Sequence, residues 1–205
     1  MAAALACVAV TCLAACGSGA APAFHPAGSA LSSGHGQSAA SVLHRFPFPA
    51  DVHFQFDSPL PVDPAQAAVV ITDENFQLAY YYGIYSQGKD HRYAAYIGDR
   101  MILASVRVTL ARESAAHEGF TGTIRFYDTS VQPTAWPGEQ AVTSCVDSSR
   151  LLDTDIRTGE IRSRSSSGAR HFLQSDILAK RGGIWRVVGT SVTYYPHGQA
   201  KECKP

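Results

Sequence analysis

The pattern of apolar and polar residues changes its period along the chain. Val52, Phe54 and Phe56 alternate with polar neighbours, which predicts a half-buried strand over residues 51–57. Asp63-Pro64-Ala65-Gln66 then combines an N-cap residue, a proline at the first helical position and a capping-box glutamine, so a helix is predicted to begin here. Residues spaced by multiples of about 3.6 positions form its predicted inner face: Ala67, Ile71, Leu78, Tyr82 and Tyr85.

A second helical pattern covers residues 91–113, after Gly88 ends the first helix. Gly98 weakens the middle of this pattern by up to about 1 kcal/mol relative to alanine, so a kink or break is expected there. Its predicted apolar stripe comprises Tyr93, Ile97, Met101, Ala104, Val108 and Ala111. In the first helix, the consecutive tyrosines 80–82 spread over roughly 200° at about 100° per residue. At least one of them is therefore expected to be partly exposed, where it could contact a ligand or partner.

After Gly119 the pattern becomes strand-like. Segments rich in β-branched and aromatic residues predict four strands: 120–127, 141–146, 169–178 and 184–195. The short glycine loop at 181–183 is typical of a β-hairpin. Helices followed by long antiparallel strands predict an α+β fold, with N-terminal helices packed on one face of a curved, mostly antiparallel sheet.

The N-terminal residues predict export. Residues 1–15 contain no charge and no proline, and they are predicted to be a cleaved signal peptide. Leu13-Ala14-Ala15-Cys16 resembles the bacterial lipobox, in which the cysteine is diacylated on its sulfur and becomes the first residue of the mature chain. The resemblance implies that Cys16 is lipidated and anchors the protein outside the cell membrane. A basic segment before the apolar run is missing, which indicates either a start codon farther upstream or a weak export signal. The alternative to a lipoprotein is an ordinary cleaved signal without lipid.

Composition separates a spacer from a domain. Residues 16–45 hold the lipidated cysteine and a stretch rich in Gly, Ser and Ala, which cannot pack a core. They are predicted to form a flexible spacer with a mean reach of roughly 30 Å, followed by one α+β domain over residues 46–205. Lys and Arg together number 17, as do Asp and Glu, so no strong field for nucleic acid exists. The N-terminal apolar run is shorter than the ~20 residues that span a bilayer.

Cysteine usage agrees with an exported domain. Cys7 and Cys12 leave with the signal peptide and Cys16 takes the lipid, so two of the five cysteines remain. In an oxidising compartment Cys145 and Cys203 are predicted to form a disulfide. Two free thiols or a metal pair are the alternatives, although no CxxC spacing supports zinc. No metal and no cofactor is predicted.

The order of one strand, two helices and a meander of long strands resembles the nuclear transport factor 2-like superfamily, the cystatin-like α+β roll. Within it, the chain is similar to small exported actinobacterial lipoproteins. The motifs that carry this resemblance are Cys16, Phe48-Pro49-Ala50-Asp51-Val52, Cys145 followed by Asp147-Ser148-Ser149, Asp155-Ile156-Arg157-Thr158-Gly159, and Cys203. The resemblance implies a cone with an open mouth, dimerisation through the open sheet, and either enzymatic or non-catalytic roles.

No complete catalytic set is recognised, since GxSxG, HExxH, P-loop and GxGxxG motifs are all absent. Residues that could line the mouth of the cone form the candidate pocket: Tyr82, Tyr85, Tyr96, Arg125, Tyr127, Asp147 and Trp185. The sequence therefore favours a membrane-anchored, extracytoplasmic lipoprotein whose non-catalytic roll domain binds an envelope protein or a small hydrophobic ligand. The alternative is a small isomerase, dehydratase or cyclase, with an acid/base residue and a tyrosine in the cavity.

Overall fold

The computed structural model describes residues 46–162, 170–195 and Cys203. The predicted signal peptide, Cys16 and the predicted spacer lie outside the described residues. The elements follow in the order β1 (Val52–Phe56), α2 (Pro64–Tyr85), the short 3-10 helix η1 (Arg92–Tyr96), α3 (Arg100–Ala115), β2 (Glu118–Pro133), β3 (Glu139–Asp155), β4 (His171–Arg181) and β5 (Ile184–Tyr195). None of the helices in this described part is long and apolar enough to cross a membrane.

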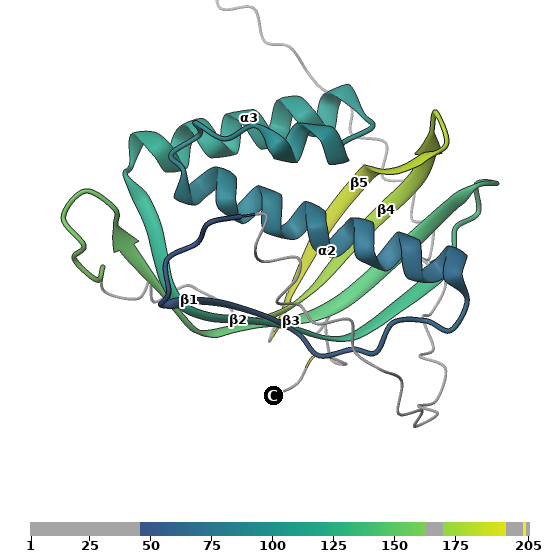
Figure 1. Cartoon of the computed structure of the whole chain (residues 1–205), viewed down its shortest axis with the longest axis horizontal. Coiled ribbons are helices and arrows are strands. Elements are labelled where there is room, and N and C mark those ends of the chain that lie inside the picture. Colours follow the sequence, from purple (N-terminus) through teal and green to yellow (C-terminus); the bar gives the residue numbers. More distant parts are fainter. Residues whose placement is uncertain (1–45, 163–169, 196–202, 204–205) are drawn as a thin grey trace, which may run out of the picture. The chain divides into compact units, whose positions relative to one another are not determined.

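The five strands form one sheet in the order of the chain, β1-β2-β3-β4-β5. Only β1 runs parallel to its neighbour β2, and the other three pairings are antiparallel. Figure 1 shows α2 lying across the concave face of this curved sheet, with α3 beyond it. The predicted α+β class, with helices on one face of a mostly antiparallel sheet, is confirmed.

Two irregularities bend the long β2–β3 ribbon. The pairing register shifts between Thr123 and Arg125 and again between Tyr127 and Ser130, and each shift inserts an extra residue that increases local twist. Asp128, in the second irregularity, has a positive φ of 51°. Next to the first, Gly122 has a φ of 97°, and a Cβ there would overlap a backbone carbonyl oxygen of β3. These bends let the sheet curve around α2.

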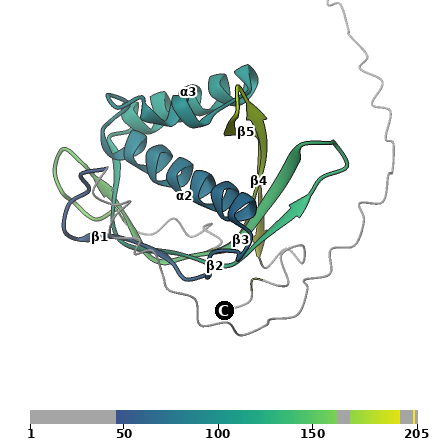
Figure 2. The same cartoon turned by 45° about the vertical axis from the view of Figure 1, so that its right-hand side comes forward.

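Helix α2 is buried on almost every side, which differs from the predicted single inner face. Leu78 is fully buried as expected, but Ala67, Ile71, Tyr82 and Tyr85 are only partly buried. The other buried apolar side chains of α2 are Val69, Val70, Phe76 and Ala79. The reason is its position between two layers, the sheet on one side and α3 on the other (Figure 2). A helix enclosed in this way has no single apolar stripe.

Both ends of α2 are set by local chemistry. The side chain of Asp63 accepts hydrogen bonds from the backbone N–H groups of Ala65 and Gln66, as the capping pattern predicts. The helix ends at Tyr85, where Gln87 takes a φ of 55° and the N–H of Gly88 donates to the carbonyl oxygen of Gly83 at 2.8 Å.

The second helical pattern breaks at Gly98, where the sequence weakens it. The N–H of Gly98 donates to the carbonyl oxygen of Val187 in β5, and Asp99 caps a new helix, α3. Before the break, Tyr93 and Ile97 of the predicted stripe are buried. Within α3 the prediction is wrong, because its part of the stripe points to solvent, with Met101 76% and Val108 71% exposed. The packed face comprises Ile102, Leu103, Val106 and Leu110. Capping at Asp99 resets the helical phase, and the larger branched side chains fill the space over α2.

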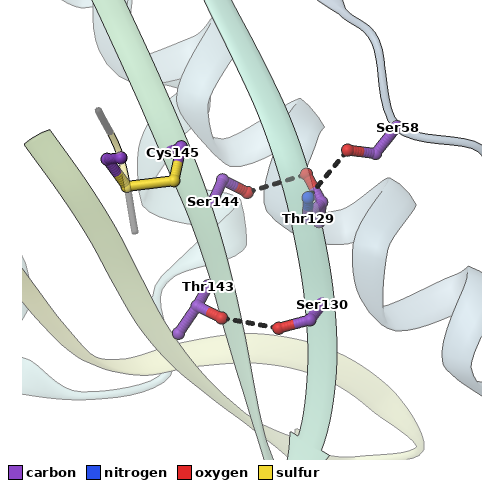
Figure 3. The surroundings of a disulfide bond; sticks show 7 residues. Ser58, Thr129, Ser130, Thr143, Ser144 and Cys145 are labelled. Atoms are coloured by element: carbon purple, nitrogen blue, oxygen red, sulfur yellow. Dashed lines mark hydrogen bonds between the residues drawn. A yellow bond between two sulfur atoms is a disulfide. The ribbon is translucent and has the colours of Figure 1, made fainter. Parts of the chain in front are cut away.

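The predicted disulfide is present between Cys145 of β3 and Cys203, with 5.3 Å between their Cα atoms. Figure 3 shows that the bond lies beside two hydroxyl pairs linking β2 and β3. Thr129 Oγ1 lies 2.9 Å from Ser144 Oγ, and Ser130 Oγ lies 2.7 Å from Thr143 Oγ1. The covalent bond therefore joins the C-terminal region to the central strand of the sheet.

Candidate functional site

A cleft of about 300 Å³ opens between the helices and the β4–β5 hairpin. It is lined by Phe76, Gln77, Tyr80, Tyr81, Ser105, Val106, Thr109, Phe172, Gln174, Thr190, Val192 and Tyr194. The helical side comes from α2 and α3, and the sheet side comes from β4 and β5, which lie next to each other in Figures 1 and 2. Its volume is at the lower end of the range typical of small-molecule sites, about 300–1,000 Å³.

The sheet side of the cleft follows from the alternation of side chains along a strand. Phe172, Gln174 and Asp176 are two residues apart on β4, so they project from the same face. Phe172 and Gln174 line the cleft, whereas Asp176 is completely buried behind them. On β5, Thr190 pairs with Asp176 and also lines the cleft.

Amide groups connect this cleft to the buried Asp176. Gln77 Nε2 of α2 donates to Asp176 Oδ2 at 2.7 Å. Gln174 Nε2 lies 3.0 Å from both carboxylate oxygens and 3.1 Å from Thr190 Oγ1. Gln77 and Gln174 are themselves buried, with exposed fractions of 5% and 9%. Because buried polar groups keep their hydrogen bonds, this network holds α2 against β4 in one position.

A second carboxyl group, Asp73, shares this buried position. Its side chain is hydrogen-bonded to Asp176, while its Oδ1 atom has no hydrogen-bond partner. Burial, followed by repulsion from Asp176, raises the pKa of Asp73 well above its ordinary value. Burial also raises the pKa of Asp176, but hydrogen bonds from its neighbours oppose that shift. Of the two carboxyl groups, Asp73 therefore holds a proton more strongly than Asp176.

Aromatic rings supply the apolar wall of the cleft. The rings of Phe76 and Tyr80 lie 6.4 Å apart, and those of Tyr80 and Tyr81 meet edge to face at 5.7 Å. Across the cleft, the Phe172 and Tyr194 rings lie 5.7 Å apart. Burial raises the pKa of both Tyr80 and Tyr81, so their hydroxyl groups stay protonated. The cleft thus combines flat apolar rings with neutral hydrogen-bonding groups.

Two residues of the predicted pocket lie elsewhere on α2. Tyr82 and Tyr85 line a more open hollow with Ser86, Gln87, Lys89, Asp90 and Ile156. The Tyr82 ring packs edge-on against Phe48 at 5.2 Å and lies beneath the Arg92 guanidinium at 5.1 Å. The three consecutive tyrosines therefore divide between two surfaces, because Tyr80 and Tyr81 face the cleft.

Three more predicted residues lie on the face of the sheet opposite the helices. Arg125 and Asp147 line a polar hollow of about 190 Å³ there. Arg125 forms an ion pair with Asp57 and lies 4.8 Å from the centre of the Tyr127 ring. Asp147 Oδ1 lies 3.3 Å from His171 Nε2. His171 therefore points to the face of the sheet opposite the cleft, whereas its neighbour Phe172 lines the cleft.

Tyr96 and Trp185 pack against the hydrophobic core at their inner sides. The Lys180 amine lies 5.2 Å from the centre of the Trp185 ring. The seven predicted pocket residues are thus distributed over the molecule, and none of them lines the cleft described above.

Sequence reasoning did not single out Asp73, Gln77, Gln174 or Asp176. A signal was present in each element. Asp73 and Gln77 are four residues apart on a helix, and Gln174 and Asp176 are two apart on a strand, so each pair shares a face with apolar residues. Polar residues on an otherwise apolar face need hydrogen-bond partners once they are buried. Two elements that both carry such residues therefore indicate a buried hydrogen-bond network between them. Which two elements meet is decided by tertiary structure.

Comparisons with known proteins assign neither a family nor an activity. No protein-family model and no curated protein matches the chain. Among solved structures, it is similar to the intermembrane space region of the chloroplast protein ARC6, with 13% identity and a TM-score of 0.45 over 66% of this chain and 99% of that chain. It is also similar to Aln2 from a Streptomyces species, with 13% identity and a TM-score of 0.42 over 66% of this chain and 94% of that chain. Neither similarity assigns an activity to this protein.

Proposed function

We propose that the protein is a lipid-anchored, extracytoplasmic ligand-binding protein, whose domain is a roll of the nuclear transport factor 2-like type. The observation that carries the binding role is the cleft, which has aromatic walls and the buried amides of Gln77 from α2 and Gln174 from β4. Concave sites with apolar linings and a few fixed polar groups are typical of small-molecule binding. The ligand is a small molecule with an apolar body and one neutral hydrogen-bonding group.

The cleft is suited to ligand binding because its polar groups are already held in place in the absence of a ligand. Gln77 and Gln174 both donate to Asp176, so their amides are fixed. A preorganised site loses less side-chain entropy on binding. An anionic ligand group is disfavoured, since Asp176 lies directly behind these amides and no basic residue among those described lines the cleft.

A blocking substitution tests the binding role. N-phenyl-1-naphthylamine, an uncharged fluorescent compound, serves as a probe of the apolar cleft. Ser105→Trp places an indole at the rim of the cleft, and Ala115→Trp, at the exposed end of the same helix, is the matched control. Saturable binding to the wild type and the control, with at least about tenfold weaker binding to Ser105→Trp, is expected when a bulky group fills the site. Equal binding of the probe to all three proteins would show that the cleft is not the binding site.

Anchoring is tested separately, by mass spectrometry of the membrane fraction. A diacylglycerol group on Cys16 supports the proposed location, and an unmodified thiol at that position overturns it. Either outcome leaves the proposed binding cleft unaffected, because the two experiments concern different parts of the chain.

The buried pair of carboxyl groups favours a second candidate, an enzyme that moves protons. An aspartate with a raised pKa beside a second carboxyl group, here Asp73 beside Asp176, is the kind of pair that acid/base chemistry uses. Within the described residues, however, no hydrogen bond joins either aspartate to Tyr80 or Tyr81. Solvent-deuterium exchange into a hydrophobic ketone, followed by NMR, tests this role. Exchange that is lost in Asp176→Asn supports an enzyme, and exchange no faster than in buffer refutes it.

A further inference from the structure

The outward face of α3 carries an apolar stripe that the core does not use. Its members recur three or four residues apart: Met101, Ala104, Val108 and Ala111. All four are exposed, and Met101 and Val108 are among the most exposed large apolar residues described. In Figure 1, α3 forms the layer farthest from the sheet, so this face has solvent in front of it.

Basic side chains border the stripe on both sides. At about 100° per residue, Arg100 and Arg107 flank it on one edge and Arg112 on the other. All three arginines are exposed. The only acidic residue within the helix, Glu113, is held by Arg112 at 2.6 Å and is only 12% exposed. The outward face of α3 is thus apolar along its middle and positive along its edges.

The tip of the β4–β5 hairpin extends this surface. Gly98, just before α3, packs against the side chains of Arg181 and Arg186, which places the hairpin beside the N-terminal end of the helix. Ile184 at the hairpin tip is 60% exposed, and Lys180 and Arg181 precede it. Two adjacent elements therefore present the same combination of an exposed apolar side chain and basic neighbours.

We propose that α3 and the β4–β5 tip form a docking surface for a bilayer containing anionic phospholipids. Helices that lie in a membrane interface carry this pattern, with apolar side chains toward the acyl region and arginines at the phosphate level. The positive edges complement anionic headgroups, and no exposed acid of α3 opposes them. The stripe is small, so the contact is weak and reversible. A lipid anchor on the same chain would raise its effective concentration at the membrane. The surface does not depend on the cleft.

Vesicle co-sedimentation of the full chain tests this surface, with phosphatidylcholine vesicles that contain or lack phosphatidylglycerol. Three double variants are compared with the wild type: Arg100→Gln with Arg107→Gln, Met101→Ser with Val108→Ser, and the control Arg150→Gln with Arg170→Gln. The control removes the same charge from exposed positions outside α3 and the hairpin tip, and Arg150 lines the hollow on the face of the sheet opposite the helices. Thermal melts confirm that each variant folds.

The proposal expects tighter binding to the anionic vesicles. Each basic residue near such a surface contributes roughly a fivefold change in affinity, so the first variant should bind at least about tenfold more weakly. The serine variant should also bind more weakly, and the control should retain wild-type binding. Equal losses in the first variant and the control would show a global charge effect. Equal binding of all proteins, or equal binding to both vesicles, would show that α3 does not dock. Each of these results overturns the proposal.

Discussion

Replacing Asp73 by asparagine is expected to flatten the pH dependence of stability. Asp73 has a raised pKa because it is buried beside Asp176. In the folded protein it therefore keeps a proton at pH values where an unfolded aspartate has lost one. The stabilisation from this proton is complete below about pH 4 and is lost as pH rises toward the raised pKa. Asparagine is neutral at every pH and can still donate to Asp176.

The magnitude follows from counting one proton. Where the folded state holds one proton more than the unfolded state, the free energy of unfolding falls by about 1.4 kcal/mol per pH unit. Between the ordinary pKa of aspartate and the raised pKa of Asp73, the wild type should therefore lose up to about 1.4 kcal/mol per pH unit more than Asp73→Asn. The difference between the two proteins is informative, because Glu74 and Glu118, with pKa values of about 7, titrate in both.

The assay is urea unfolding followed by circular dichroism at pH values between 5 and 7. Asp128→Asn is the matched control, since Asp128 is exposed and asparagine tolerates its positive φ. Its curve should run parallel to that of the wild type. Asp176→Asn provides a contrast: one amide donor would then face another, and about 1–3 kcal/mol should be lost at every pH.

A parallel pair of curves for the wild type and Asp73→Asn would refute this reasoning. It would mean that the proton is not held by the buried pair. If stability depended less on pH in Asp176→Asn but was unchanged in Asp73→Asn, the group with the raised pKa that controls stability would instead be Asp176.

The remaining predictions concern stability. Replacing Cys145 and Cys203 by serine opens a loop with a sequence separation of 58 and should cost about 4 kcal/mol in urea unfolding under oxidising conditions; no change relative to the oxidised wild type would contradict the bond. Gly122→Ala should lower the melting temperature far more than Gly138→Ala, since both have positive φ but only the first is obstructed by neighbouring backbone; equal losses would rule out that obstruction. Asp99→Ala should cost about 1 kcal/mol by removing a helix cap, and a neutral effect in thermal melts would count against the capping geometry.

Local chemistry explains why several elements were predicted correctly. Alternation around Phe54 predicts β1, the Asp63 cap predicts the start of α2, and the Gly182-Gly183 turn predicts the β4–β5 hairpin. Each of these signals depends on residues within one turn or strand. The Cys145–Cys203 pairing was also predictable, although it joins distant residues, because the expected export left two cysteines to pair.

The candidate site could not be predicted in the same way. The seven pocket residues were selected for their chemistry, and the structure distributes them over different surfaces. The cleft depends instead on Gln77 and Gln174, which lie on α2 and β4 and meet through Asp176. Nothing within either segment shows that the other will lie against it.

The sequence by itself determined the element types, the helix boundaries set by capping, the α+β class and the cysteine pairing. Tertiary structure decided which face of α3 is buried, because two apolar stripes compete on that helix and only packing over α2 selects the larger side chains. It also placed Asp73 beside Asp176 in the core, which raises the pKa of Asp73. A pKa shift of this kind arises when burial and a nearby charge act together, and both depend on residues brought from distant parts of the chain.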